Sequence, residues 1–137
     1  DELNSHVGLL ASLIEQDHRL QEQLQLIQRQ LFQLGFVISA DATFTEEDIG
    51  KLETDIDDMV QNLAPMTSFI LPGGCQSASQ AHVCRTVCRR AERILAGVAE
   101  SNDVPQTSQG FINRLSDYFF VVARFLNFES GLDDIKL

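Results

Sequence analysis

The chain has 137 residues, 44% of them hydrophobic, so it can bury one sizeable core. Its ten basic and twenty acidic residues give a formal charge of −10, which repels phosphate backbones and argues against nucleic-acid binding. No apolar run reaches the ~18 residues that a membrane-spanning helix needs. Three prolines and eight glycines favour long helices over a many-turned β fold, and an odd count of three cysteines favours a reducing compartment.

The N-terminal quarter of the chain predicts one long helix, from about Glu2 to Leu34. Apolar residues recur there at steps of three and four, and Asp17 interrupts the stripe. At the usual rise per residue this helix would be about 50 Å long, which is typical of a helical bundle. Gly35 is expected to cap its C-terminus.

A second helix is predicted to begin after Thr45, whose side chain is a good N-cap, and to end before Pro65. The preceding stretch, 36–44, has no clear period and predicts a loop. The acidic run Asp55, Asp57 and Asp58 is interpreted as a solvated helix face. The segment 69–74, which ends in Pro-Gly-Gly, predicts a stiff turn with two positions free to take positive φ.

Two further helices are predicted, from about Ser77 to Glu100 and from about Gln109 to Glu129, and residues 130–137 are predicted to form a loose tail. The buried stripe of the first of these helices is built largely from small residues: Ala81, Cys84, Cys88 and Ala91. The whole pattern indicates an all-α fold, a single domain over 1–137 forming an antiparallel four- or five-helix bundle.

The helix over Ser77 to Glu100 carries an unusual cluster of charged side chains. Its members are His82, Arg85, Arg89, Arg90, Glu92 and Arg93. Most share one flank, and arginines this close repel each other unless anions or carboxylates lie between them. The guanidinium fork suits phosphate oxygens. The alternative is an ordinary solvated, salt-bridged face.

The last predicted helix has a matching polar flank of Asn113, Ser116, Asp117 and Phe120 beside its apolar stripe. A helix that faces a bundle core would normally carry lysine or glutamate there. Local hydrogen bonding is the alternative explanation, and the residues alone leave both open.

Familiar catalytic motifs are absent from the sequence, which has no Ser-His-Asp order, HExxH or P-loop. Cys84 and Cys88 lie one turn apart near His82, but three ligands on one rigid helix rarely converge on a metal, so small core cysteines are the preferred interpretation. His6 and His18 are interpreted as surface or interface side chains. The sequence therefore offers no protein nucleophile, general base or metal-ligand set.

Three blocks of sequence stand in a recognisable order over nearly the whole chain. They are DELNSHVG at 1–8, FILPGG at 69–74 continued by AHVCRTVCRRAER at 81–93, and FINRLSDYFF at 111–120. These blocks resemble the signature of the PduO-type ATP:cob(I)alamin adenosyltransferases, the middle block being highly specific. The resemblance implies an enzyme that transfers the 5′-deoxyadenosyl group of ATP to reduced cobalamin and releases triphosphate.

The same resemblance implies a homotrimer of bundles with ATP and the corrinoid bound at subunit interfaces. It assigns Arg89, Arg90, Glu92 and Asn113 to the nucleotide site, with Arg89 and Asn113 as catalytic residues. It places Phe69 and Phe120 beside the corrin, and pairs Arg85 with Asp1 of a neighbouring subunit. Ordinary core packing is the alternative for both phenylalanines.

This chemistry would explain the missing nucleophile, because cobalt(I) itself attacks the ribose C5′. Arginines and Mg²⁺ would neutralise the charge growing on the triphosphate. By analogy with the family, an aromatic side chain near the corrin excludes the lower axial base and leaves the cobalt four-coordinate, so that cobalt(II) is easier to reduce.

One departure from the family is the Thr/Gly/Asp-rich nucleotide-binding segment before the first helix, which this chain does not contain, so we expect the intact protein to be longer. The alternative functions are a non-catalytic corrinoid carrier and a trimeric helical interaction module. The resemblance also suggests a corrinoid reductase and an adenosylcobalamin-dependent enzyme as partners, with no nucleic acid or membrane. It suggests a cytoplasmic location, or the mitochondrial matrix in a eukaryote.

Overall fold

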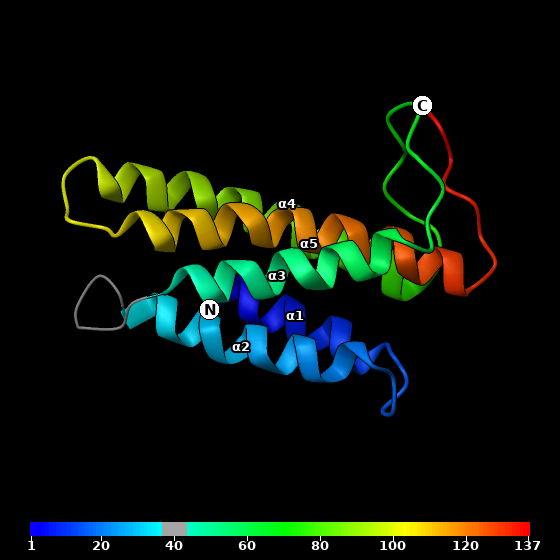
Figure 1. The fold of residues 1–137 in the computed structure, drawn as a ribbon, viewed down its shortest axis with the longest axis horizontal. Coiled ribbons are helices and arrows are strands. Elements are labelled where there is room, and N and C mark those ends of the chain that lie inside the picture. Colours follow the sequence, from blue (N-terminus) through cyan, green and yellow to red (C-terminus); the bar gives the residue numbers. More distant parts are fainter. Residues whose placement is uncertain (37–43) are drawn as a thin grey trace.

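The computed structural model describes residues 1–36 and 44–137, which fold into five α-helices (Figure 1). They are α1 (Glu2–Ser12), α2 (Leu20–Phe36), α3 (Glu46–Val60), α4 (Gln76–Ala99) and α5 (Gln106–Glu129). The predicted all-α bundle is confirmed. The predicted loop over 36–44 lies almost wholly outside the described residues.

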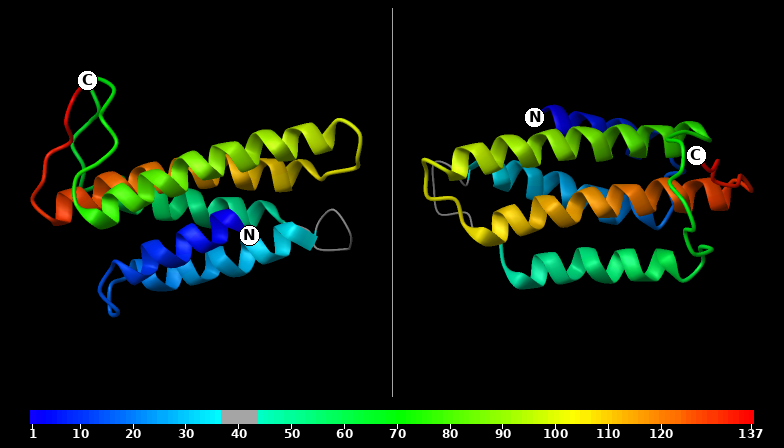
Figure 2. Two further views of the ribbon diagram at one scale, coloured as in Figure 1. Left: turned by 180° about the vertical axis from the view of Figure 1, so that it is seen from behind. Right: turned by 90° about the horizontal axis from the view of Figure 1, so that it is seen from above.

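α5 lies at the centre of the bundle and packs against α4 on one side and α3 on the other, while α1 packs against α4 and α2 (Figure 2). Its central place explains its composition, since nearly every position from Phe111 to Asn127 is buried except on the flank that carries Asn113 and Asp117. None of the helices in the described ranges is long and apolar enough to cross a membrane.

The single helix predicted from Glu2 to Leu34 was wrong, because the chain turns back at residues 13–19 to form two packed helices. The apolar stripe lapses between Ile14 and Leu20, so a straight helix would expose one half of it to water. Local hydrogen bonds stabilise the turn. Gln21 Nε2 donates to the carbonyls of Ala11, Ile14 and Glu15, and His18 Nδ1 accepts the Leu20 N–H at 3.0 Å.

The expected cap at Gly35 was also wrong, since α2 continues through this residue to Phe36. The cap at Thr45 is confirmed, as a capping box in which Asp48 Oδ2 accepts the Thr45 backbone N–H at 2.9 Å. Asp55 does not belong to a solvated face. It is only 8% exposed and is paired with Lys51 at 2.6 Å, whereas its neighbours Asp57 and Asp58 are exposed as expected.

Residues 130–137 are not a loose tail, because they pair with the connection between α3 and α4. Ile70 and Lys136 form an antiparallel bridge, the Leu71 N–H donates to Ile135 O and the Leu137 N–H donates to Phe69 O, both at 2.8 Å. In Figure 1 the two segments rise together from one end of the bundle. The backbone N–H and C=O groups of the tail bond to the connection between α3 and α4, and no pattern in the tail sequence indicates this pairing.

Candidate active site

The two polar flanks predicted from the sequence meet along the seam between α4 and α5. Asn113 Nδ2 donates to Glu92 Oε2 at 2.7 Å, which joins the two helices about two turns from the α4–α5 connection. The bond leaves the Asn113 carbonyl oxygen and the second Glu92 oxygen free for further contacts. The structure therefore brings together two of the predicted nucleotide-site residues.

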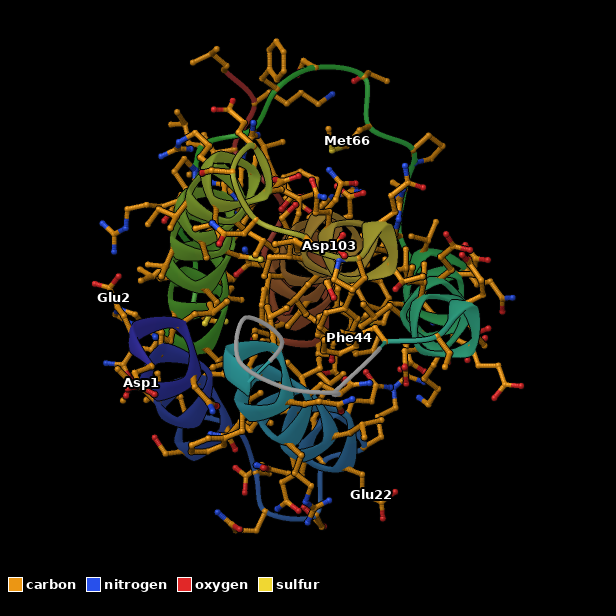
Figure 3. All side chains as sticks on the ribbon, turned by 90° about the vertical axis from the view of Figure 1, so that its left-hand side faces the viewer. Asp1, Glu2, Glu22, Phe44, Met66 and Asp103 are labelled. Atoms are coloured by element: carbon orange, nitrogen blue, oxygen red, sulfur yellow. The ribbon has the colours of Figure 1, made fainter. Side chains whose placement is uncertain are left out.

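Arg89 and Arg90 are neighbours in sequence but lie in different surroundings, because successive helical residues point about 100° apart. Arg90 forms an ion pair with Glu2 at the start of α1, which Figure 3 shows at the outer side of the bundle. Arg89 is exposed and makes no ion pair or hydrogen bond with any of the described residues. Its charge and, more strongly, burial lower the pKa of Arg85. An unpaired arginine among like charges is suited to an external anion.

Nearer the start of α4, His82 is buried against Phe120 of α5, and the two rings meet edge to face with centroids 6.1 Å apart. Arg85 Nε donates to His82 Nδ1 at 3.4 Å, so the imidazole proton lies on Nε2. That Nε2 is buried without a partner among the described residues. Burial, and then the charge of Arg85, lower the pKa of His82, while Asp134 opposes them. The imidazole is therefore neutral at pH 7.

These contacts define a common axis for the two predicted subsites. Glu92 and His82 are ten residues apart on α4, or about 15 Å, and their partners on α5, Asn113 and Phe120, are about 10 Å apart. A hollow of about 380 Å³ opens beside His82 and Arg85 and is closed on its other side by the turn at Gly73. The residues that line this hollow all come from α4 and the connection before it, so it adjoins the His82 end of α4.

Phe69 lies in the connection between α3 and α4 and exposes 78% of its surface. No ring contact joins it to Phe120 within the described part of the chain. So large an exposed aromatic side chain is not explained by core packing, which was the alternative for Phe69. Phe120 is half-buried and does contact a neighbour, so packing explains part of its environment.

Asp1 and Arg85 are not brought together within one chain. Asp1 borders a groove with Ala91, Ile94 and Leu95, which lie six to ten residues further along α4 than Arg85, or about 9–15 Å. A pair between them would need a second chain, and it stays a prediction.

Cys84 and Cys88 lie in the core with no exposed surface, as the preferred interpretation required. Burial raises the pKa of Cys84 to about 12 and raises that of Cys88 further, so neither thiol is a ready thiolate ligand at neutral pH. Among residues 1–36 and 44–137, no three His, Cys, Asp or Glu side chains are placed to hold a metal ion.

Two residues of the site region escaped the sequence interpretation, Arg124 and Asn127 on α5. Asn127 is 3% exposed and its side chain bonds the turn at Gly73. Arg124 reaches both the tail and the connection that carries Phe69. The signal was their position in the apolar run 121–128, since a buried polar side chain needs a partner.

The fold and the site define a class of protein: an all-α bundle with an arginine cluster on α4 and without a metal-ligand group among its described residues. The chain belongs to the cobalamin adenosyltransferase family, whose model matches residues 1–126. The predicted resemblance is thus confirmed.

Three similar proteins match nearly the whole of this chain. A corrinoid adenosyltransferase from Bacillus subtilis is 41% identical over 99% of the chain and 75% of that protein. A cobalamin adenosyltransferase from Cupriavidus metallidurans is 39% identical over 98% of the chain and 74% of that protein. A solved variant of the PduO-type ATP:corrinoid adenosyltransferase from Lactobacillus reuteri, complexed with cobalamin and ATP, is 38% identical with a TM-score of 0.94. The match covers 100% of this chain and 81% of that one.

Proposed function

We propose that this chain is a corrinoid adenosyltransferase, which transfers the 5′-deoxyadenosyl group of ATP to the cobalt of cob(I)alamin. The observation that carries the proposal is the match over the whole chain to an adenosyltransferase structure complexed with cobalamin and ATP. The electron pair of cobalt(I) forms the cobalt–carbon bond while the bond from C5′ to the triphosphate oxygen breaks. Cobalt is formally oxidised to cobalt(III), and triphosphate leaves with the electron pair of the broken bond.

The protein needs no nucleophile for this reaction, so its own residues have to align the substrates and stabilise the leaving group. Arg89 is the group we assign to the triphosphate, because the family resemblance selects it and because it is exposed and unpaired within the described residues. Asn113 and Glu92, joined at 2.7 Å, would orient the nucleotide beside it. Arg90 would contribute to the same site once its pair with Glu2 opens or is shared.

Mg²⁺ fits this arrangement as a companion of ATP, because it is usually bound by one or two carboxylates together with substrate phosphates. Glu92 is the carboxylate that would meet the ion. When bound, Mg²⁺ would neutralise charge on the triphosphate.

Phe69 and Phe120 would form the corrin subsite at the other end of the α4–α5 seam. An exposed phenylalanine offers an apolar surface to the lower face of the corrin, from which it would exclude the axial base and water. The roughly 10–15 Å between this group and the Glu92–Asn113 pair leaves room for an adenosine between cobalt and triphosphate.

The decisive experiment is an anaerobic assay of the full-length protein with cob(I)alamin, ATP and Mg²⁺, followed by visible spectroscopy. We expect conversion to the adenosylcobalamin spectrum only when ATP is present, together with stabilisation of the fold by ATP. A spectral shift of the corrinoid without ATP-dependent conversion would instead identify a carrier. No response to either substrate would leave a helical interaction module.

The assembly and location are part of the same proposal. A homotrimer would place the neighbouring Asp1 within reach of Arg85 and complete the site between subunits. A cytoplasmic location agrees with the three cysteines, which remain free thiols. A reductase that supplies cobalt(I) and an enzyme that consumes adenosylcobalamin are the partners that the chemistry requires.

A further inference from the structure

Two polar side chains interrupt the apolar face near the end of α5, and both make hydrogen bonds to other segments of the chain. Asn127 Oδ1 accepts the Cys75 backbone N–H at 3.0 Å, and its Nδ2 donates to Gly73 O at 2.9 Å. Its own backbone carbonyl accepts the Leu132 N–H at 2.9 Å. One residue thus bonds the turn before α4 and the start of the C-terminal tail.

The fit of Asn127 against this turn is tight. Gly74 has φ +113°, and a Cβ built on it would lie 2.1 Å from Asn127 Oδ1. Glycine is therefore required at position 74 for two reasons: a Cβ would collide with the Asn127 amide, and the backbone has a positive φ.

Arg124 lies one turn earlier on α5 and makes a second bridge between the same two segments. Its Nε donates to Asp134 Oδ2 of the tail at 2.8 Å, and a terminal guanidinium nitrogen donates to Ala64 O at 2.8 Å. Its side chain is only 12% exposed; the bond to Asp134 is partly buried, and the bond to Ala64 lies at the surface. Ala64 and Gly73 lie on either side of Phe69, so α5 holds the connection at both ends.

The tail completes the arrangement by pairing directly with the residues around Phe69. Leu137 N–H donates to Phe69 O and Leu71 N–H donates to Ile135 O. The backbone of Phe69 is therefore bonded to the tail, and both the tail and the connection are bonded to Arg124 and Asn127. The exposed ring of Phe69 itself has no such restraint, so its position depends on this backbone framework.

We propose that Arg124 and Asn127 are positioning residues for the corrin subsite, which hold Phe69 where it meets the lower face of the corrin. This inference rests on the proposed function. It follows that loss of either side chain should weaken the use of the corrinoid and spare the use of ATP, because the Glu92–Asn113 pair lies well away along the seam.

The test uses the full-length enzyme with three variants: Asn127→Asp, Arg124→Leu and Arg124→Lys. The aspartate keeps the acceptor for Cys75 but turns a carboxylate toward the Gly73 carbonyl, leucine removes both arginine contacts, and lysine can keep one. We expect KM for cob(I)alamin to rise about tenfold or more in Asn127→Asp and Arg124→Leu, and less in Arg124→Lys. KM for ATP should change by no more than about twofold, because the substituted residues do not contact the proposed nucleotide site.

A second readout separates positioning from general loss of stability. With bound cob(II)alamin and ATP, the variants should show a smaller fraction of four-coordinate cobalt(II) than the wild type, measured by electron paramagnetic resonance. Asn102→Ala is the matched control, because Asn102 Nδ2 bonds only Val98 O at the opposite end of α4. Its KM values and cobalt spectrum should equal those of the wild type.

Each outcome bears on one proposal only. If the wild type does not convert cob(I)alamin, the proposed function fails. If the wild type is active and the folded variants keep their KM for the corrinoid and their cobalt(II) spectrum, the positioning role is wrong. A parallel rise of KM for both substrates, with a matching fall in thermal stability, would also overturn it. Should Asn127→Asp not fold, the two Arg124 variants decide the matter.

Discussion

Arg89 differs from its neighbours on α4 in what surrounds it. Arg90 is paired with Glu2, Arg85 is held by His82, and Arg89 has no partner within the described residues. Charge alone therefore does not identify the arginine that binds the triphosphate. The contacts of Arg85 and Arg90 leave Arg89 and Arg93, which is likewise exposed and unpaired among the described residues, and the resemblance to the family selects Arg89.

Arg89→Ala should lower turnover by about two orders of magnitude or more, the usual effect of removing one group that stabilises developing charge. The fold should be unaffected because Arg89 is exposed and unpaired. The measurement is the anaerobic adenosylation assay together with thermal unfolding. Arg29→Ala, which removes an exposed arginine of α2, is the control. Full activity in Arg89→Ala would refute the assignment of the triphosphate site.

His82 predicts a specific response to acid. Its pKa is lowered in the fold by burial and by Arg85, with Asp134 opposing, whereas the unfolded chain keeps the ordinary value near 6.5. The unfolded state therefore takes up a proton first as the pH falls. Between the two pKa values the free energy of unfolding should decrease by up to about 1.4 kcal/mol per pH unit on acidification.

His82→Gln keeps an acceptor for Arg85 and removes the titration, so the loss of stability between pH 7.5 and pH 5.5 should become smaller than in the wild type. Urea unfolding at the two pH values measures it. Equal losses in both proteins would show that His82 titrates alike in the folded and unfolded states.

At the scale of elements, the connection between α3 and α4 is the segment whose conformation depends most on contacts distant in sequence. Its glycines were expected to permit positive φ, and Gly73 and Gly74 do take values of +154° and +113°. The expectation is confirmed because proline favours a turn and glycine takes positive φ at no steric cost. The tail that pairs with the connection was not predicted, because an antiparallel bridge is specified jointly by two segments.

Gly74→Ala should destabilise the protein by about 2 kcal/mol or more, since alanine strains a positive φ and its Cβ collides with the Asn127 amide. Gly50→Ala is the matched comparison. Gly50 lies inside α3 with no atom within 4 Å of a built Cβ, so alanine should stabilise the fold by about 0.5–1 kcal/mol. Chemical denaturation measures both, and equal effects would contradict the argument.

At the scale of the whole molecule, the predicted pair of Asp1 and Arg85 concerns the assembly of the protein. Asp1 borders residues of α4 that lie about 9–15 Å along the helix from Arg85, its predicted partner, and a pair between chains stays a prediction. The exposed apolar side chains of α4, such as Val83 and Ile94, agree with a face covered by a second copy.

We expect sedimentation of the full-length protein to give three times the mass of its subunit. Arg85→Asp should weaken the assembly, because it places two carboxylates opposite each other, and the double change Asp1→Arg with Arg85→Asp should restore it. A monomeric wild type would remove the basis of the interface, and an unimpaired Arg85→Asp variant would remove this pair from it.

The sequence by itself determined the class of fold, the bounds of α4 and α5 to within about three residues, and the family. Apolar periodicity is a local property of a helix, and the motifs at 69–93 and 111–120 are contiguous stretches that can be read without coordinates. Thr45 and the two core cysteines were predicted for the same reason, because caps and stripes depend on near neighbours.

Only the tertiary structure decided where the chain reverses and which polar groups meet. Packing between distant segments produces four such features: the turn between α1 and α2, the burial of Asp55, the Glu92–Asn113 bond and the bridge from Arg124 to the tail. Their energies depend on what lies opposite in space, and a one-dimensional pattern does not contain that partner. Asn127 is the plainest example of what the sequence pattern does not contain. Its amide stands among apolar residues, and its role comes only from the hydrogen bond to Cys75, 52 residues earlier in the chain.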